Sequence, residues 1–120
     1  MPRISASRRA QARATVFEFL PALARRFLAC RLGSRGTVSV FEASPGVFTV
    51  VHQKPGAALG EVIERRIAQI RASAGGYRLF WKRCNGRWTA YAAEGDAEFA
   101  GSFRACLSEI ARDRSGCFWS

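Results

Sequence analysis

Fifteen residues in the second half of the chain combine cationic and aromatic side chains at high density. They run from Tyr77 to Tyr91, YRLFWKRCNGRWTAY, with four cations, five aromatic rings and no acid. Cations can neutralise phosphates or carboxylates, and exposed rings can stack on nucleobases. The segment therefore predicts a surface for an anionic partner. Its candidate residues are Arg78, Phe80, Lys82, Arg83, Arg87 and Tyr91.

A second basic segment lies at the N-terminus, where residues 1–36 hold eight arginines and one acid. Residues 1–14 are almost devoid of large apolar side chains, which predicts a flexible basic arm ahead of one domain over 15–120. The net charge of +10 favours an anionic partner, although a general arginine bias would also produce it. The arm would add non-specific affinity through Arg8, Arg9 and Arg13.

The sequence contains few residues of the types and spacings that catalysis requires. General acid–base or nucleophilic catalysis needs a positioned base, most often histidine, and the chain has one histidine, His52, which we expect in a loop or at the surface. No glycine-rich phosphate loop and no closely spaced set of metal ligands is present. We therefore expect neither an enzyme nor a cofactor. The four cysteines lack zinc-site spacing, and we expect reduced thiols in a cytoplasmic protein.

A β-hairpin is expected to position the basic aromatic segment. Asn85-Gly86 between two β-favouring runs is a strong hairpin signal. We favour a two-residue type I′ loop, which pairs Phe80 with Tyr91 and puts both rings on the basic face. A three-residue loop with a bulge is the alternative, and it would move Trp88 to the face of Phe80.

The remaining elements follow from periodicity and capping signals. Helical spacing predicts a helix over 17–32, with its regular part starting at Pro21 and Gly33 as its cap. A first hairpin is expected from Thr37 to Ala43 and Val47 to His52, and a last helix from Ala97 to Arg112 with Asp96 as its N-cap. Residues 58–72 are ambiguous, because their apolar spacing fits an amphipathic helix while Ile67 to Ala72 also fits a strand.

The hairpin and the ending Asp113 to Trp119 resemble domain-of-unknown-function family 3024, a group of small bacterial proteins. Its members share a tryptophan–tryptophan–tyrosine hairpin and an aspartate, any two, glycine, any one, phenylalanine-tryptophan-glycine ending. This chain departs from the pattern at Thr89, where the family often has histidine, and at Ser120 in place of the last glycine. The fold determinants in this reading are Trp81, Trp88, Asn85, Gly86, Gly116, Phe118 and Trp119. We also expect the apolar ending Cys117-Phe118-Trp119 to dock on the sheet, because an exposed Phe-Trp pair would be sticky.

The resemblance favours the strand for Ile67 to Ala72. It thus implies an α+β fold, in which an antiparallel sheet of about five strands, two hairpins plus one strand, is packed by an N-terminal and a C-terminal helix. The family brings no function with it. We therefore expect a non-enzymatic binding or regulatory module that contacts an acidic protein or forms a homodimer. Binding of single-stranded DNA or RNA is the alternative, and no segment is long and apolar enough for a membrane span.

Overall fold

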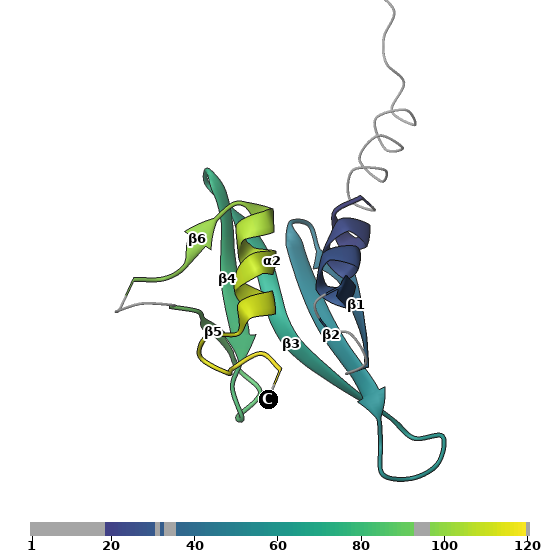
Figure 1. Ribbon diagram of the computed structural model, residues 1–120. Helices are drawn as coiled ribbons and strands as arrows, with labels where there is room; N and C mark the ends of the chain where they lie inside the picture. Colours follow the sequence, from purple (N-terminus) through teal and green to yellow (C-terminus); the bar gives the residue numbers. More distant parts are fainter. Residues whose placement is uncertain (1–18, 31, 33–35, 93–96, 120) are drawn as a thin grey trace, which may run out of the picture.

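The computed structural model describes residues 19–30, 32, 36–92 and 97–119, so the predicted arm with Arg8, Arg9 and Arg13 lies outside the described residues. The fold is an antiparallel six-stranded sheet with an N-terminal helix over 19–30 and a C-terminal helix (Figure 1). The predicted α+β class and its layout are confirmed. The strands are β1 (Thr37–Ser44), β2 (Val47–Pro55), β3 (Val62–Ser73), β4 (Gly76–Lys82), β5 (Trp88–Ala90) and β6 (Ala100–Gly101), and the C-terminal helix is α2 (Phe103–Arg112).

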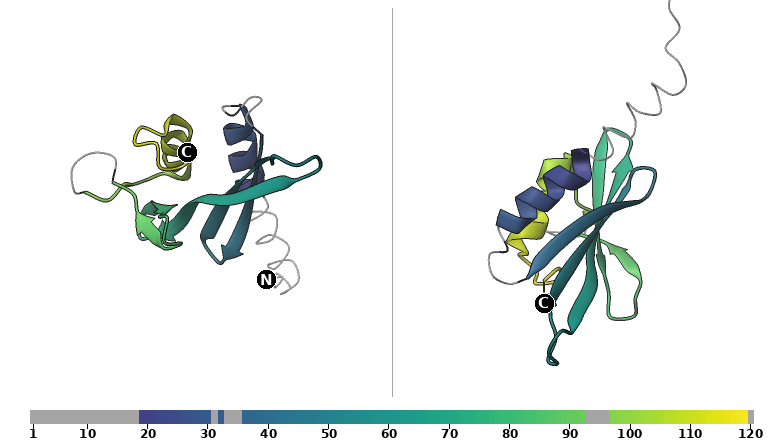
Figure 2. Two further views of the ribbon diagram at one scale, coloured as in Figure 1. Left: turned by 90° about the horizontal axis from the view of Figure 1, so that it is seen from below. Right: turned by 90° about the vertical axis from the view of Figure 1, so that its right-hand side faces the viewer.

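Both helices lie on the same face of the sheet (Figure 2). The sheet runs β1-β2-β3-β4-β5 in space, and β6 pairs with β4 beyond the end of β5. The core lies between the sheet and the helices, as strand alternation requires for a sheet covered on one side. Its fully buried larger side chains include Leu28, Phe48, Val50, Ile70, Leu79, Tyr91, Leu107, Ile110 and Phe118.

The N-terminal helix already includes residues 19 and 20, so the prediction that its regular part begins at Pro21 is wrong. Pro21 is thus a residue of the described helix. Ala24 and Leu28 face the core, one turn apart. The predicted cap at Gly33 lies outside the described residues.

The first hairpin is confirmed, with β2 longer than expected. Its strands pair from Thr37↔Gln53 to Ser44↔Val47. Because β2 extends to Pro55, His52 lies inside a strand and is 7 % exposed, so its predicted surface or loop position is wrong. Its ring meets the indole of Trp119 edge-on, with centroids 5.1 Å apart.

Residues 62–73 form one long strand, which settles the ambiguity in favour of the strand. The pairing of β2 with β3 shifts at one point, where Val50↔Ala68 is followed by Val51↔Arg66. Ile67 is therefore the extra residue of a β-bulge. Four consecutive residues from Ile67 to Ile70 are buried across this irregularity.

The β4–β5 hairpin forms, but with the three-residue loop Cys84-Asn85-Gly86. Gly86 N–H donates to Arg83 O at 2.9 Å, and Arg83 N–H donates to Arg87 O at 2.9 Å. Gly86 has a φ of 81° and Asn85 is not among the residues with positive φ, so the turn is not type I′. The favoured two-residue loop is wrong and the alternative is right, because a turn followed by a left-handed glycine needs only one such residue.

The C-terminal helix begins six residues later than predicted, at Phe103. Ser102 is its N-cap, and the Ser102 hydroxyl accepts a hydrogen bond from Ala105 N–H at 3.0 Å. Residues 97–101 do not join the helix because β6 pairs with β4 instead. The predicted N-cap Asp96 lies outside the described residues. None of the described helical segments has the length and apolar character that a bilayer crossing requires.

Candidate anion-binding site

A cleft opens where two strand ladders separate. β3 pairs with β4 only from Ser73↔Gly76 to Ala68↔Trp81. Beyond this point β3 stays paired with β2 as far as Pro55↔Val62, while β4 continues into its hairpin with β5. The space between the first half of β3 and this hairpin is a cleft of about 710 Å³. The separation of the ladders thus creates a site that no single segment contains.

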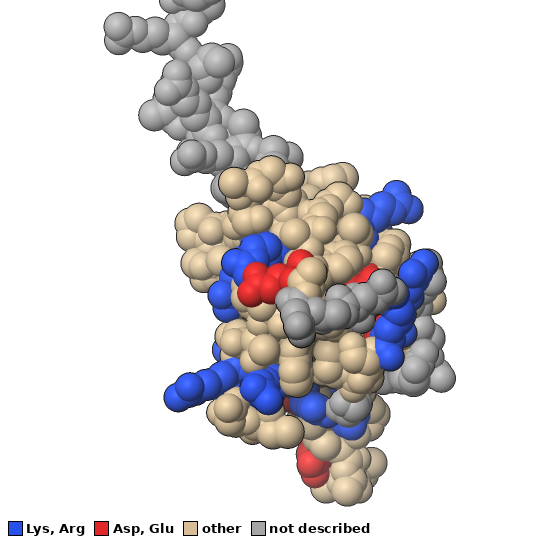
Figure 3. All heavy atoms as spheres, turned by 90° about the vertical axis from the view of Figure 1, so that its left-hand side faces the viewer, with Lys and Arg blue, Asp and Glu red and all other residues tan. Residues whose placement is uncertain are grey.

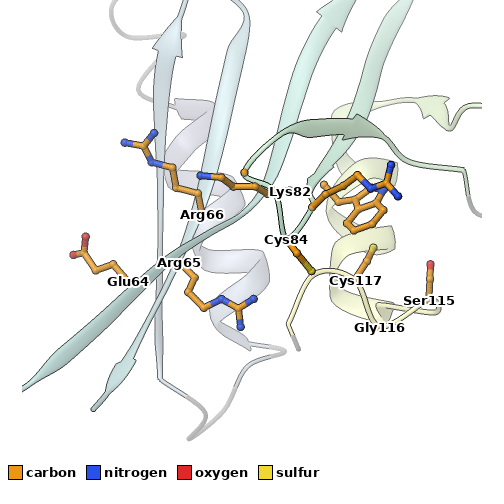
Figure 4. A pocket seen from close by; sticks show the side chains of 11 residues that line it. Glu64, Arg65, Arg66, Lys82, Cys84, Ser115, Gly116 and Cys117 are labelled. Atoms are coloured by element: carbon orange, nitrogen blue, oxygen red, sulfur yellow. The ribbon is translucent and has the colours of Figure 1, made fainter. Parts of the chain in front are cut away.

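Four cations line this cleft, which we call the basic cleft (Figure 4). Arg65 and Arg66 come from β3, and Lys82 and Arg83 come from the end of β4. One acid faces them, Glu64, whose carboxylate accepts a hydrogen bond from Gln53 Nε2 at 2.7 Å. The other lining residues are Trp81, Cys84, Gly86, Ser115, Gly116 and Cys117.

The surface around the hairpin is visibly cationic. Lys and Arg side chains gather across the lower part of the face that bears the β4–β5 hairpin (Figure 3). Two of them lie near indole rings: Arg83 Cζ is 5.8 Å from the Trp81 ring centroid, and Lys82 Nζ is 5.8 Å from that of Trp88. A ring face attracts a cation at such distances, so the tryptophans help to hold these charges beside the cleft.

The far wall of the basic cleft is the loop after α2, and partly buried polar contacts hold it in place. Asp113 ends the helix in the left-handed region, with φ 48°. Its carboxylate accepts the backbone N–H groups of Phe118 at 3.0 Å and Trp119 at 3.2 Å. The indole N–H of Trp119 donates to Ile110 O at 2.8 Å. The predicted docking of this apolar ending is confirmed, and the Asp–Gly–Phe–Trp ending is a structural closure.

Glu109 is a buried carboxylate that ties the same loop to the sheet. It is 4 % exposed and accepts hydrogen bonds from the Tyr91 hydroxyl at 2.9 Å and from Arg114 Nε at 2.8 Å. A buried charge needs such partners to offset its desolvation. Burial raises the pKa of Tyr91, so its phenol stays protonated well above neutral pH.

Two of the predicted site residues are buried and do not form a stacking surface. Tyr91 is 2 % exposed and packs against Phe99 and Phe118 on the helix side of the sheet. Its predicted place on the basic face is wrong because the three-residue loop shifts the register to Phe80↔Ala90. Phe80 does lie on the basic face, but it is 8 % exposed.

Arginines cover the ring of Phe80. Arg71 Cζ lies 3.9 Å and Arg78 Cζ 5.3 Å from its centroid. Arg78 also forms an ion pair with Glu98. Burial and the neighbouring Arg78 lower the pKa of Arg71. These two guanidiniums are therefore engaged with the protein, whereas Lys82 and Arg83 face the cleft and Arg87 is exposed at the hairpin tip.

Arg65, Arg66 and Cys117 were not predicted as site residues. The signal for the arginines was weak, because the cleft depends on the register of β3 and on where its pairing with β4 stops. A strand over the whole of 62–73 would have placed two adjacent cations next to the hairpin. Cys117 reaches the cleft only because the docked C-terminal loop carries it there.

The basic cleft offers electrostatic attraction to an anionic ligand. The described residues contain no group of three or more histidine, cysteine, aspartate or glutamate side chains arranged to hold a metal ion. Burial raises the pKa of the Cys106 thiol to about 12 and also raises the pKa of the Cys117 thiol, which disfavours the reactive thiolate form of both. The cations of the basic cleft, by contrast, have exposed or half-buried side chains.

Comparison with known proteins gives one match. No curated protein and no solved structure matches the chain significantly. The model of the family described as "Domain of unknown function (DUF3024)" matches residues 10–120, nearly the whole chain. The match includes the hairpin, the basic cleft and the Asp113-to-Trp119 closure, in agreement with the resemblance seen in the sequence. The chain therefore belongs to the DUF3024 family.

Proposed function

We propose that this protein is a non-enzymatic binding module whose basic cleft receives an acidic segment of another protein. One observation carries the proposal: four cations face a single acid around a cleft of about 710 Å³. Such a concentration of one sign attracts the opposite sign and raises the rate of encounter. The four free thiols suit a reducing compartment such as the cytoplasm.

Burial of Phe80 and Tyr91, the two rings expected to stack on bases, favours a protein partner over single-stranded nucleic acid. Stacking on bases needs open ring faces, since it contributes about 1–3 kcal/mol per base. Tyr91 is in the core and Phe80 is covered by two guanidiniums. A carboxylate-rich peptide needs no stacking surface, because arginine can bind carboxylates through paired hydrogen bonds.

Fluorescence anisotropy with three labelled probes tests the proposal. They are a peptide with six consecutive glutamates, its glutamine counterpart, and a single-stranded oligothymidylate. At ~50 mM salt the acidic peptide should bind and the glutamine peptide should not, and ~300 mM salt should weaken binding at least tenfold because the cations are solvent-accessible. Tighter binding of the oligothymidylate than of the acidic peptide would assign the cleft to nucleic acid and refute the proposal.

Substitutions inside and outside the cleft locate the binding, with losses compared per charge removed. Exposed ion pairs contribute about 0.2–1 kcal/mol each. The combination of Arg65→Ala with Arg66→Ala should therefore raise the Kd for the acidic peptide about tenfold. Arg87→Ala is the control, because Arg87 is exposed on the same hairpin but does not line the cleft. Sedimentation in the absence of peptide separates binding from homodimer formation. Equal losses of binding free energy per charge removed would show that general charge, and not the cleft, attracts the peptide.

A further inference from the structure

We infer that the acidic segment binds as an added β-strand along the open edge of β3, from Val62 to Ile67. This inference rests on the proposed function and specifies its geometry. Within the described chain, β4 pairs with β3 only from Ala68 onward, and β2 occupies the other edge of β3. Over Val62 to Ile67 no described strand therefore pairs with the edge of β3 that faces the cleft, and such an edge is a template for strand addition.

The cations lie on both sides of this edge. Arg65 is paired opposite His52, whose ring points toward the helices, and Arg66 is paired opposite Val51 on the other face. Figure 4 shows the two arginines leaving β3 in opposite directions, with Lys82 on the side of Arg66. Side chains of an added strand also alternate between the two faces. Consecutive acids would therefore meet a cation on each face, so the fitting segment is an uninterrupted acidic run.

The same arginines disfavour a second copy of the chain as the occupant. If two β3 edges paired with each other, Arg65 and Arg66 of one copy would lie beside those of the other, and like charges placed opposite each other destabilise a ladder. Six extended residues span about 20 Å, which a segment of five or six acidic residues matches. Charge thus selects an acidic peptide over self-association.

N-methylation of the peptide backbone tests strand addition separately from charge. A hexaglutamate peptide methylated on two adjacent central amides is compared with the unmodified one. Both peptides keep the same charge. Because a strand directs alternate N–H groups to one neighbour, one of the two methylated amides faces β3 in either phase, and methylation should weaken binding at least tenfold. Equal binding of the two peptides would refute strand addition and leave charge-based binding intact.

Two further results complete the test. Hydrogen exchange monitored by NMR should show slower exchange of backbone amides within 62–67 when the unmodified peptide binds, whereas amides in β1 should not change. Unaltered exchange in 62–67 with saturated peptide would also refute strand addition. If the unmodified peptide itself fails to bind at ~50 mM salt, the proposed function fails and the inference fails with it. Failure of strand addition, in which the peptide still binds, can therefore be distinguished from failure of the proposed function, in which it does not.

Discussion

The hydroxyl of Tyr91 donates a 2.9 Å hydrogen bond to the buried carboxylate of Glu109, which joins the sheet to α2 across the core. The family hairpin and the C-terminal helix are thus connected by a polar contact inside an apolar interior. The phenol of Tyr91 is also 3.3 Å from the hydroxyl of Ser115, in the loop that lines the basic cleft. The last ring of the predicted binding surface is therefore a structural residue.

Tyr91→Phe should lower the free energy of unfolding by about 1–2 kcal/mol. The substitution keeps the ring but removes one donor from a buried carboxylate, which retains Arg114 as a partner. Chemical denaturation measures the change. Tyr77→Phe is the control, since it keeps the edge-on contact with Phe103 and should cost well under 1 kcal/mol. Equal costs for the two substitutions would contradict the assigned role of the Tyr91 hydroxyl.

Asp113→Ala should loosen the C-terminal closure and destabilise the protein by about 1–3 kcal/mol, because the N–H groups of Phe118 and Trp119 lose their acceptor. Faster hydrogen exchange of these two amides would accompany the loss. Arg112→Gln, an exposed change one residue away, should alter stability by less than 1 kcal/mol. Unchanged exchange at Phe118 and Trp119 in Asp113→Ala would argue against the closure.

Gly86→Ala should cost about 1–2 kcal/mol of stability, because alanine resists the left-handed conformation that φ 81° requires. A Cβ at this position would meet nothing within 4 Å, so the cost comes from the backbone and not from a clash. Gly86→Asn should cost less, since asparagine tolerates this region. Thermal denaturation of both variants measures the difference, and an equal cost would exclude the backbone explanation.

Stability should fall in alkaline solution, partly because of Cys106. Burial raises the pKa of its thiol from 9.0 to about 12, so the unfolded chain loses this proton at lower pH than the folded protein does. Below about pH 9 the contribution is complete, and between pH 9 and 12 it declines by about 1.4 kcal/mol per pH unit. Cys106→Ala should make the decline shallower. Tyr91, whose pKa is also raised, should preserve part of the decline at higher pH. Parallel pH profiles for the two proteins would contradict this.

Thiol labelling gives an independent test of ligand position. Cys84 lines the basic cleft and Cys30 lies on the N-terminal helix, and both are exposed. A saturating acidic peptide should slow alkylation of Cys84 several-fold and leave Cys30 unaffected, as read by mass spectrometry of labelled fragments. Cys106 is buried and should react only on unfolding. Equal protection of Cys84 and Cys30 would place the peptide elsewhere.

The sequence was sufficient to predict the hairpin, the order of the elements and the docked C-terminal ending, because each has local chemistry. Asn85-Gly86 marks a turn, and apolar Phe118 and Trp119 require cover. The loop length was harder to predict, since one left-handed glycine or two left-handed residues both suit Asn-Gly. That single-residue difference moved Tyr91 from the predicted surface into the core.

The basic cleft could not be predicted, because it depends on pairing between distant strands. β3 contains a bulge at Ile67, which breaks the alternation of buried and exposed residues. The resulting apolar spacing matches that of an amphipathic helix as well as a strand. The approach of Arg65 and Arg66 to Lys82 also depends on where β3 and β4 stop pairing, which no local motif specifies.

The bulge at Ile67 also bears on how this strand can tolerate change in evolution. Val62 to Arg66 and Ala68 to Ser73 alternate out of phase with each other, and Ile67 supplies the offset. Losing Ile67 would place the pair Val51↔Arg66 directly after Val50↔Ala68, so the ladder would become regular while Arg65 and Arg66 kept their faces. Losing a residue between Val62 and Arg66 would instead turn every residue before it in the strand over to the opposite face. A one-residue deletion should therefore be tolerated better at Ile67 than within Val62 to Arg66.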